Sequence, residues 1–131
     1  MGVAPGASRS TSRELRAGPG TPAEARSFLS EALERFDVDV DRDTANLLTS
    51  EIASNAARHG KEPIDVSISV EGGLRVSVFD RGEGFDPEEH RIDRDSSAWA
   101  EGGWGLQVVQ HLSSEWGVVR RDGGTEVWFR L

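Results

Sequence analysis

The sequence predicts an α+β fold in which helices cover one face of a mixed, mainly antiparallel sheet, as a two-layer α/β sandwich. Two observations lead to this prediction. Apolar residues recur at helical spacing through residues 22–36 and 41–59 and again after Gly105, whereas they alternate with a period of two through 63–80. The chain has 131 residues, the size of one domain with a single core.

The first elements follow from turn and capping signals. Residues 1–11 are small and polar and are predicted to form a disordered N-terminal tail, so the domain spans 12–131. Residues 11–17 are a candidate edge strand. Thr21, as a possible N-cap, and Pro22, at the first helical position, begin a helix of about 22–36.

The second helix, about 41–59, has Asp41 or Asp43 as its candidate cap, and Gly60 ends it. The alternating segment that follows is folded back around Gly72 and Gly73, which predicts a hairpin with one buried face.

A long polar connection follows the hairpin, and connections of this length are typically functional or disordered. Helical spacing returns in "WGLQVVQHLSSEW". Two last strands, "WGVVRR" and "TEVWFRL", are joined through Asp122, Gly123 and Gly124.

Composition excludes several classes of function. The net charge of −8 argues against binding a nucleic-acid backbone, which requires basic surface. Without cysteine there is no disulfide framework and no thiolate nucleophile. No apolar run approaches membrane-spanning length and the first twenty residues lack the apolar core of a signal peptide, so we expect a cytoplasmic protein that binds no membrane.

Glu51 and Asn55 lie four residues apart on the second predicted helix and therefore share one face. A solvated helix flank is the simpler interpretation. The small side chains of Ala53, Ala56 and Ala57, however, leave a shallow surface against which a ligand could sit. An amide oxygen suits Mg²⁺, which takes oxygen ligands. A carboxylate one turn earlier could take a proton from a nucleophile that attacks near that ion.

Asp80 ends the second strand of the predicted hairpin, in the sequence "DRGEG". A turn alone would account for this pattern. Because the alternate residues of the strand are expected to be buried, the Asp80 carboxylate would need a hydrogen-bond donor. The amino group of a heterocycle could be that donor, and Gly82 and Gly84 would let the backbone approach a flat ligand.

The sequence "GGWGL", Gly102 to Leu106, directly precedes the third predicted helix. A glycine-rich entry to a helix is one interpretation. A phosphate site is the other, because free backbone N–H groups and the helix dipole favour anions at that end.

Taken in order, "SEIASNAARHG", "DRGEGF" and "GGWGLQVVQHLSSEWGV" resemble the N, G1 and G2 boxes of the GHKL ATPase superfamily, which includes gyrase, histidine kinases and mismatch-repair ATPases. Within it, the chain resembles small bacterial anti-sigma regulatory factors that act as serine/threonine protein kinases. "GGTEVWFRL" resembles their closing strand, so the resemblance covers about residues 12–131. It implies a Bergerat-type ATP-binding fold.

The resemblance also implies cofactors and roles. ATP and Mg²⁺ are the expected cofactors, with Asn55 as the Mg²⁺ ligand and Asp80 as the partner of the adenine amine. Residues 85–101 would form a lid, and Glu51 would be the general base toward a serine or threonine hydroxyl. The implied ATP-binding residues are Asn55, Asp80, Gly82, Gly84, Gly103, Gly105 and Leu106.

The partners implied by the resemblance are a sigma factor, which the protein would sequester, and an anti-sigma-factor antagonist, which would receive the phosphate. A homodimer is also compatible with it. The alternative hypothesis is a non-catalytic module that keeps the fold, with or without ATP, as a docking surface. Glu51 favours the kinase, because binding alone does not require a base.

Overall fold

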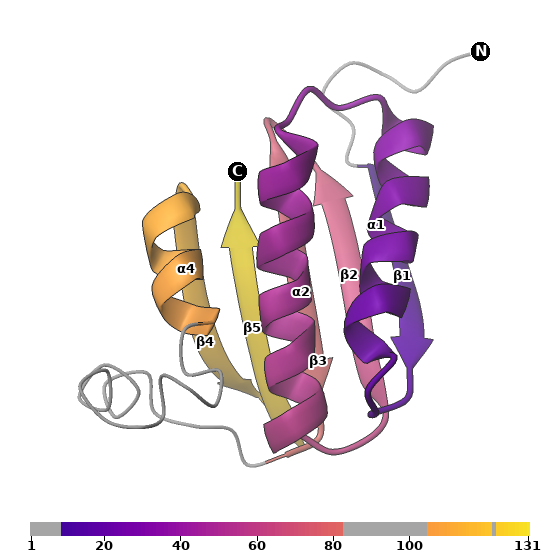
Figure 1. Ribbon diagram of the computed structural model, residues 1–131, viewed down its shortest axis with the longest axis vertical. Coiled ribbons are helices and arrows are strands. Elements are labelled where there is room, and N and C mark those ends of the chain that lie inside the picture. Colours follow the sequence, from indigo (N-terminus) through magenta and orange to yellow (C-terminus); the bar gives the residue numbers. More distant parts are fainter. Residues whose placement is uncertain (1–8, 83–104, 122) are drawn as a thin grey trace.

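The computed structural model describes residues 9–82, 105–121 and 123–131. In this part of the chain, three helices lie on one face of a five-stranded sheet, as Figure 1 shows. The predicted two-layer α+β sandwich is confirmed.

The strands are β1 (Arg9–Leu15), β2 (Ile64–Val70), β3 (Leu74–Asp80), β4 (Glu115–Arg121) and β5 (Gly124–Arg130). Their order in the sheet is β1-β2-β3-β5-β4, and every described pairing is antiparallel. Because β5 lies between β3 and β4, the end of β3 is next to the start of β5, where Asp80 pairs with Thr125.

The predicted edge strand is present as β1, which pairs with β2 along its whole length. It begins at Arg9, so residues 9–11 of the predicted tail belong to the strand. The apolar pattern could not show this, because in β1 only Leu15 is buried and pairing with β2 determines the rest. Arg13 lies 4.5 Å from the centroid of the Phe28 ring and forms an ion pair with Glu31.

Helix α1 (Thr21–Phe36) has Gly20 as its N-cap and no side-chain cap, so Thr21 is not the cap that the sequence suggested. The Thr21 hydroxyl is used in the preceding loop instead. It accepts a hydrogen bond from the Gly18 amide at 2.9 Å and donates one to the Arg16 carbonyl at 2.6 Å. The loop therefore competes for the group that would cap the helix.

Helix α2 (Arg42–His59) begins at the first of its two candidate caps. The Asp41 carboxylate accepts hydrogen bonds from the amides of Asp43 and Thr44. The helix ends at Gly60, whose amide donates to the Ala56 carbonyl at 2.8 Å. Gly60 has φ −97° and ψ −171°, an extended conformation, rather than the left-handed one that glycine commonly adopts after a helix.

The core lies between the sheet and the helices α1, α2 and α4 (Gly105–Leu112). It includes the alternating apolar residues of β2 and β3, which confirms the predicted buried face of the hairpin. No described helix is long and apolar enough to span a membrane.

Candidate functional site

Asp80 is the last residue of β3, and it is buried although it carries a carboxylate, with 5% of its surface exposed. The Gly82 amide donates a hydrogen bond of 2.7 Å to Asp80 Oδ1. Within the part of the chain that the structure describes, no hydrogen bond reaches the second oxygen, Oδ2. Asp80 therefore has one oxygen held by the protein and one that a ligand could use.

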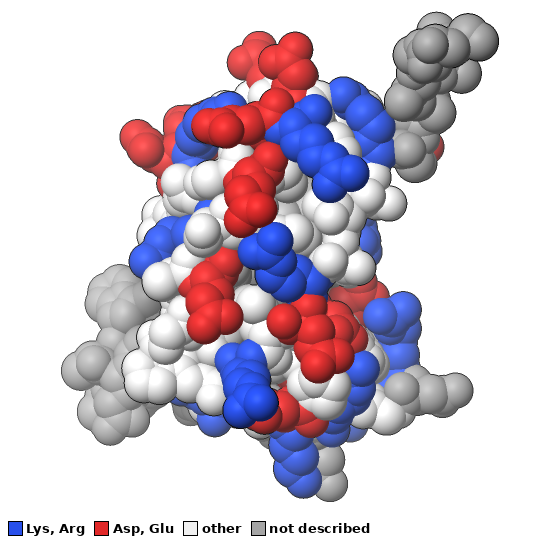
Figure 2. Space-filling view, turned by 90° about the vertical axis from the view of Figure 1, so that its right-hand side faces the viewer, with Lys and Arg blue, Asp and Glu red and all other residues white. Residues whose placement is uncertain are grey.

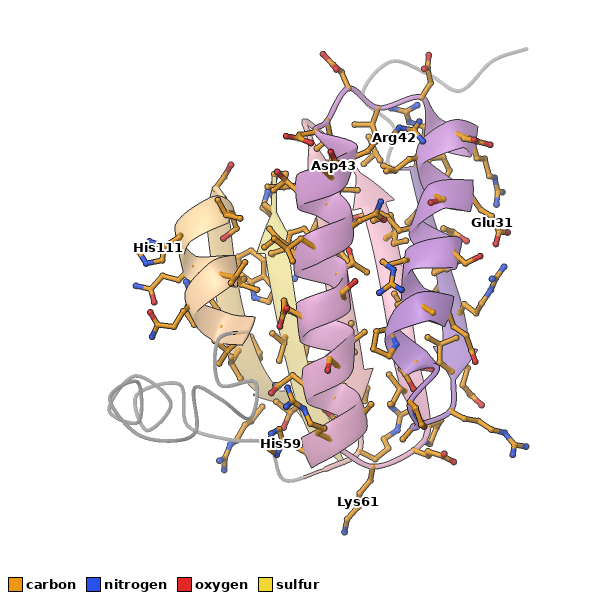
Figure 3. All side chains as sticks on the ribbon, in the orientation of Figure 1. Glu31, Arg42, Asp43, His59, Lys61 and His111 are labelled. Atoms are coloured by element: carbon orange, nitrogen blue, oxygen red, sulfur yellow. The ribbon has the colours of Figure 1, made fainter. Side chains whose placement is uncertain are left out.

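The C-terminal end of α2 meets the end of β3 at this carboxylate. Arg81 donates its amide to the Lys61 carbonyl at 2.9 Å, which ties the residue after β3 to the residue after Gly60. In Figure 3, the labelled side chains of His59 and Lys61 mark this end of α2, whereas Arg42 and Asp43 mark its start at the opposite end of the molecule.

Glu51 and Asn55 lie further back on α2, on one face. Asn55 is 9% exposed, and its side chain makes no hydrogen bond to any described residue. At about 1.5 Å per residue, Asn55 precedes Gly60 by roughly 7–8 Å along the helix axis and Glu51 precedes it by roughly 13–14 Å. The order from the strand end is therefore Asp80, Asn55, Glu51, as a ligand extended along α2 would meet them.

Burial raises the pKa of the Glu51 carboxyl above its ordinary value, and the nearby Arg58 guanidinium opposes this by lowering it. Glu51 is partly buried, so its carboxylate is less well solvated than a surface glutamate. A raised pKa makes a carboxylate a stronger base, which suits the role of proton acceptor predicted for Glu51.

The first residues of α4 supply the third part of the site. Gly105 begins the helix and Leu106, 8% exposed, anchors its first turn in the core. Figure 1 shows α4 running antiparallel to its neighbour α2, so the start of α4 faces the half of α2 that carries Asn55. Free amides at the start of a helix favour a phosphate group. Gly84, Gly103 and the predicted lid at 85–101 lie outside the described residues.

Thr125 belongs to this site, although the sequence analysis did not select it. It is 1% exposed and pairs with Asp80 across β3 and β5. Its hydroxyl donates a hydrogen bond of 3.4 Å to the Gly82 carbonyl. The sequence pattern could have indicated Thr125, because it is the polar member of a row of alternate strand residues that continues with the buried Val127 and Phe129.

These residues fit a nucleotide that carries a metal ion. The free oxygen of Asp80 can accept a hydrogen bond from an amino group, and the Asn55 amide can supply one oxygen to Mg²⁺. Among the described residues, no three histidine, aspartate or glutamate side chains are grouped so that they could hold a metal ion. A metal ion at Asn55 would take its other ligands from phosphate oxygens and water.

The fold and the candidate site together describe an α+β domain in which polar side chains gather where a helix meets the end of a central strand. The sequence profile of the histidine kinase-like ATPase domain matches residues 15–131, and the chain belongs to this family of ATP-binding domains. The GHKL resemblance drawn from the three motifs is therefore confirmed. No curated protein sequence matches the chain significantly.

Solved structures are similar over most of the chain. One contains the RsbU and RsbW domains of Rv1364c from Mycobacterium tuberculosis, at 25% identity and a TM-score of 0.67, and covers 93% of this chain and 32% of that one. Another is the histidine kinase domain of a blue-light activated histidine kinase from Erythrobacter litoralis, at 27% identity and a TM-score of 0.50, with 85% and 64% covered.

The catalytic domain of histidine kinase ThkA, at 15% identity and a TM-score of 0.53, shares the fold, with 94% of this chain and 96% of that chain covered. The chain thus spans about a third of the Rv1364c structure, 32%, and just under two thirds of the Erythrobacter litoralis domain, 64%.

Proposed function

We propose that this protein binds ATP with Mg²⁺ and transfers the γ-phosphoryl group to a serine or threonine hydroxyl of a protein partner. Asp80 binds the adenine amine, Asn55 holds Mg²⁺, and the start of α4 binds the phosphates. Glu51 accepts the proton of the attacking hydroxyl. When bound, Mg²⁺ neutralises charge on the phosphate oxygens during the transfer.

The order of polar groups along α2 is the observation that carries this proposal. Asp80 lies at the strand end, Asn55 comes next along α2, and Glu51, whose pKa is raised, lies beyond both. A base is useful only beyond the phosphates, where a second substrate approaches. A module that only bound ATP would gain nothing from a partly desolvated carboxylate at that position.

The proposed partner that receives phosphate is an anti-sigma-factor antagonist, and the proposed sequestered partner is a sigma factor. The similarity to a structure that contains an RsbW domain supports this regulatory role. Figure 2 shows the side of the molecule with α1 and β1, where basic and acidic side chains are interspersed. The ion pair between Arg13 and Glu31 lies between these two elements. A surface with both signs of charge suits a protein partner better than a polyanion.

The test is phosphoryl transfer from γ-labelled ATP to candidate antagonists encoded in the same genome. We expect label on one antagonist with the natural chain and, for Glu51→Gln, a rate lower by about 10²–10⁴ with ATP affinity retained. Transfer at an undiminished rate by Glu51→Gln would contradict the assigned role of Glu51.

A non-catalytic docking module is the second candidate function. Its distinguishing result would be ATP-dependent binding of a partner by both the natural chain and Glu51→Gln, with no label transferred by either. The raised pKa of Glu51 favours the kinase.

A further inference from the structure

Gly60 is a glycine whose backbone does not require glycine. With φ −97° and ψ −171°, it is in an extended conformation that any residue can adopt. The reason for a glycine must therefore be sought in the space around its Cα atom.

That space is filled by the Asp80 carboxylate. A Cβ atom on Gly60 would overlap Asp80 Cγ and would lie 2.6 Å from Asp80 Oδ1 and 2.6 Å from the Ala56 carbonyl oxygen. Real Cβ contacts are essentially never this short, so the carboxylate or the end of α2 would have to move.

Gly82 restricts the same oxygen from another side. Its amide donates to Asp80 Oδ1 at 2.7 Å, and a Cβ atom on Gly82 would lie 2.9 Å from Oδ1 and 3.0 Å from the Gly60 Cα atom. Asp80 Oδ1 is thus enclosed between Gly60 and the Gly82 amide. The orientation of the carboxylate, and with it the direction in which Oδ2 faces, depends on both glycines.

We infer that Gly60 is a positioning residue for recognition of the nucleotide base. Its missing side chain lets the end of α2 lie against Asp80, which keeps Oδ1 on the Gly82 amide and leaves Oδ2 to accept a hydrogen bond from the exocyclic amino group of adenine. Gly60 contacts no ligand and acts through Asp80. This inference rests on the proposed ATP site and adds a determinant of its base specificity.

The test compares Mg-ATP with Mg-purine riboside triphosphate, which lacks the exocyclic amino group. We expect the natural chain to prefer ATP by about tenfold to a hundredfold, the value of one hydrogen bond to a charged group. Gly60→Ala should lose most of this preference and still bind both triphosphates. Gly82→Ala should lose part of it. Gly18→Ala, where a Cβ atom would meet nothing within 4 Å, is the matched control and should keep it.

A second measurement requires no nucleotide. In Gly60→Ala, hydrogen exchange of the Gly82 amide should accelerate, because its acceptor is displaced, and Gly18→Ala should leave it unchanged. Circular dichroism on heating tests whether each variant folds. If Gly60→Ala does not fold, Gly82→Ala decides the question, and an unchanged ATP preference there overturns the inference.

The outcomes separate this inference from the proposed function. If the natural chain binds neither triphosphate, the proposed function and the inference both fail. In another outcome, the natural chain prefers ATP, Asp80→Asn has lost this preference, and Gly60→Ala binds both triphosphates more weakly by the same factor, so that its preference for ATP is intact. The proposed ATP site then stands. Gly60 would have only a structural role, and the inference would be wrong.

Discussion

At the scale of single residues, the candidate site depends on two largely buried polar residues, Asp80 and Asn55, whose hydrogen-bonding capacity the described residues do not use fully. Asp80 keeps one carboxylate oxygen without a described donor, and the Asn55 amide has no described hydrogen-bond partner. Among the described residues, the enclosed side-chain atoms without a hydrogen-bond partner are others, namely Asn46 Oδ1, Thr49 Oγ1 and Arg81 Nη1. The free Asp80 oxygen and the Asn55 amide therefore keep some contact with solvent, through which a ligand could reach them.

Asp80→Asn tests the base-binding role of the carboxylate. Replacing a charged acceptor by a neutral amide should weaken ATP binding about tenfold to a hundredfold, because a hydrogen bond to a charged group contributes about 1.5–3 kcal/mol. Titration with a fluorescent ATP analogue in the presence of Mg²⁺ measures this. Asp39→Asn, an exposed residue before the start of α2, should bind as the natural chain does. Equal affinities for all three proteins would remove the assignment.

The raised pKa of Glu51 predicts how transfer depends on pH. A general base must be deprotonated, so the rate should fall on acidification through the pKa of Glu51, which lies above that of a solvated glutamate, about 4.3. Arg58 lowers this pKa, so Arg58→Gln should shift the acid limb of the rate profile to higher pH. Arg42→Gln, at the other end of α2, should leave the profile in place, and a shift there of equal size would contradict the prediction.

At the scale of elements, helix α2 is the element that holds most of the candidate site in place. It carries Glu51 and Asn55, packs against both α1 and α4, and touches the end of β3 through Gly60. Its start is fixed by the Asp41 cap and its end by the hydrogen bond from Arg81 to Lys61. A change at either end should therefore reach the site through the position of the helix.

Asp41→Ala should remove the cap of α2 and lower the free energy of unfolding by about 0.5–2 kcal/mol, because two amides lose their acceptor. Urea unfolding followed by circular dichroism measures the loss. Asp39→Ala, which also removes an exposed aspartate near that end, should change stability by no more than about 0.5 kcal/mol. A comparable loss in both variants would mean that local charge, rather than the cap, is responsible.

At the scale of the whole molecule, the two faces of the sheet differ in how much they contribute to the stability of the folded state. The face toward the helices is lined by fully buried apolar residues, of which Phe129 is the largest. The other face carries Phe79, which lies within cation–π distance of Arg81 and Arg121, at 4.6 and 4.8 Å from the ring centroid. Stability should therefore depend mainly on the face that the helices cover.

Phe129→Ala should lower the free energy of unfolding by about 3–5 kcal/mol. That loss is a large share of the roughly 5–15 kcal/mol typical of a domain, so the unfolding midpoint should fall steeply. Phe79→Ala removes the same ring from the opposite face, where it is only partly buried, and should cost clearly less. Equal midpoints for the two variants would show that the outer face contributes as much as the core.

The amino-acid pattern alone was sufficient for the layers, and it selected the polar residues of the proposed site. Apolar periodicity is local information, so it indicated α1, α2 and the β2–β3 hairpin, and the three motifs selected Glu51, Asn55 and Asp80. The N-terminal boundary was less certain, because β1 has little apolar pattern and is determined by its pairing with β2.

Which residues meet at the end of β3 follows from the three-dimensional fold and could not be predicted from the sequence. The sequence suggested that Gly60 ends α2 and left Thr125 in a strand. The fold brings both to Asp80, one through the end of a helix and the other through pairing with β5. The physical reason is that these contacts join segments distant in the chain. Whether a glycine serves a turn or makes room for a carboxylate depends on what lies against it, and no local pattern records that.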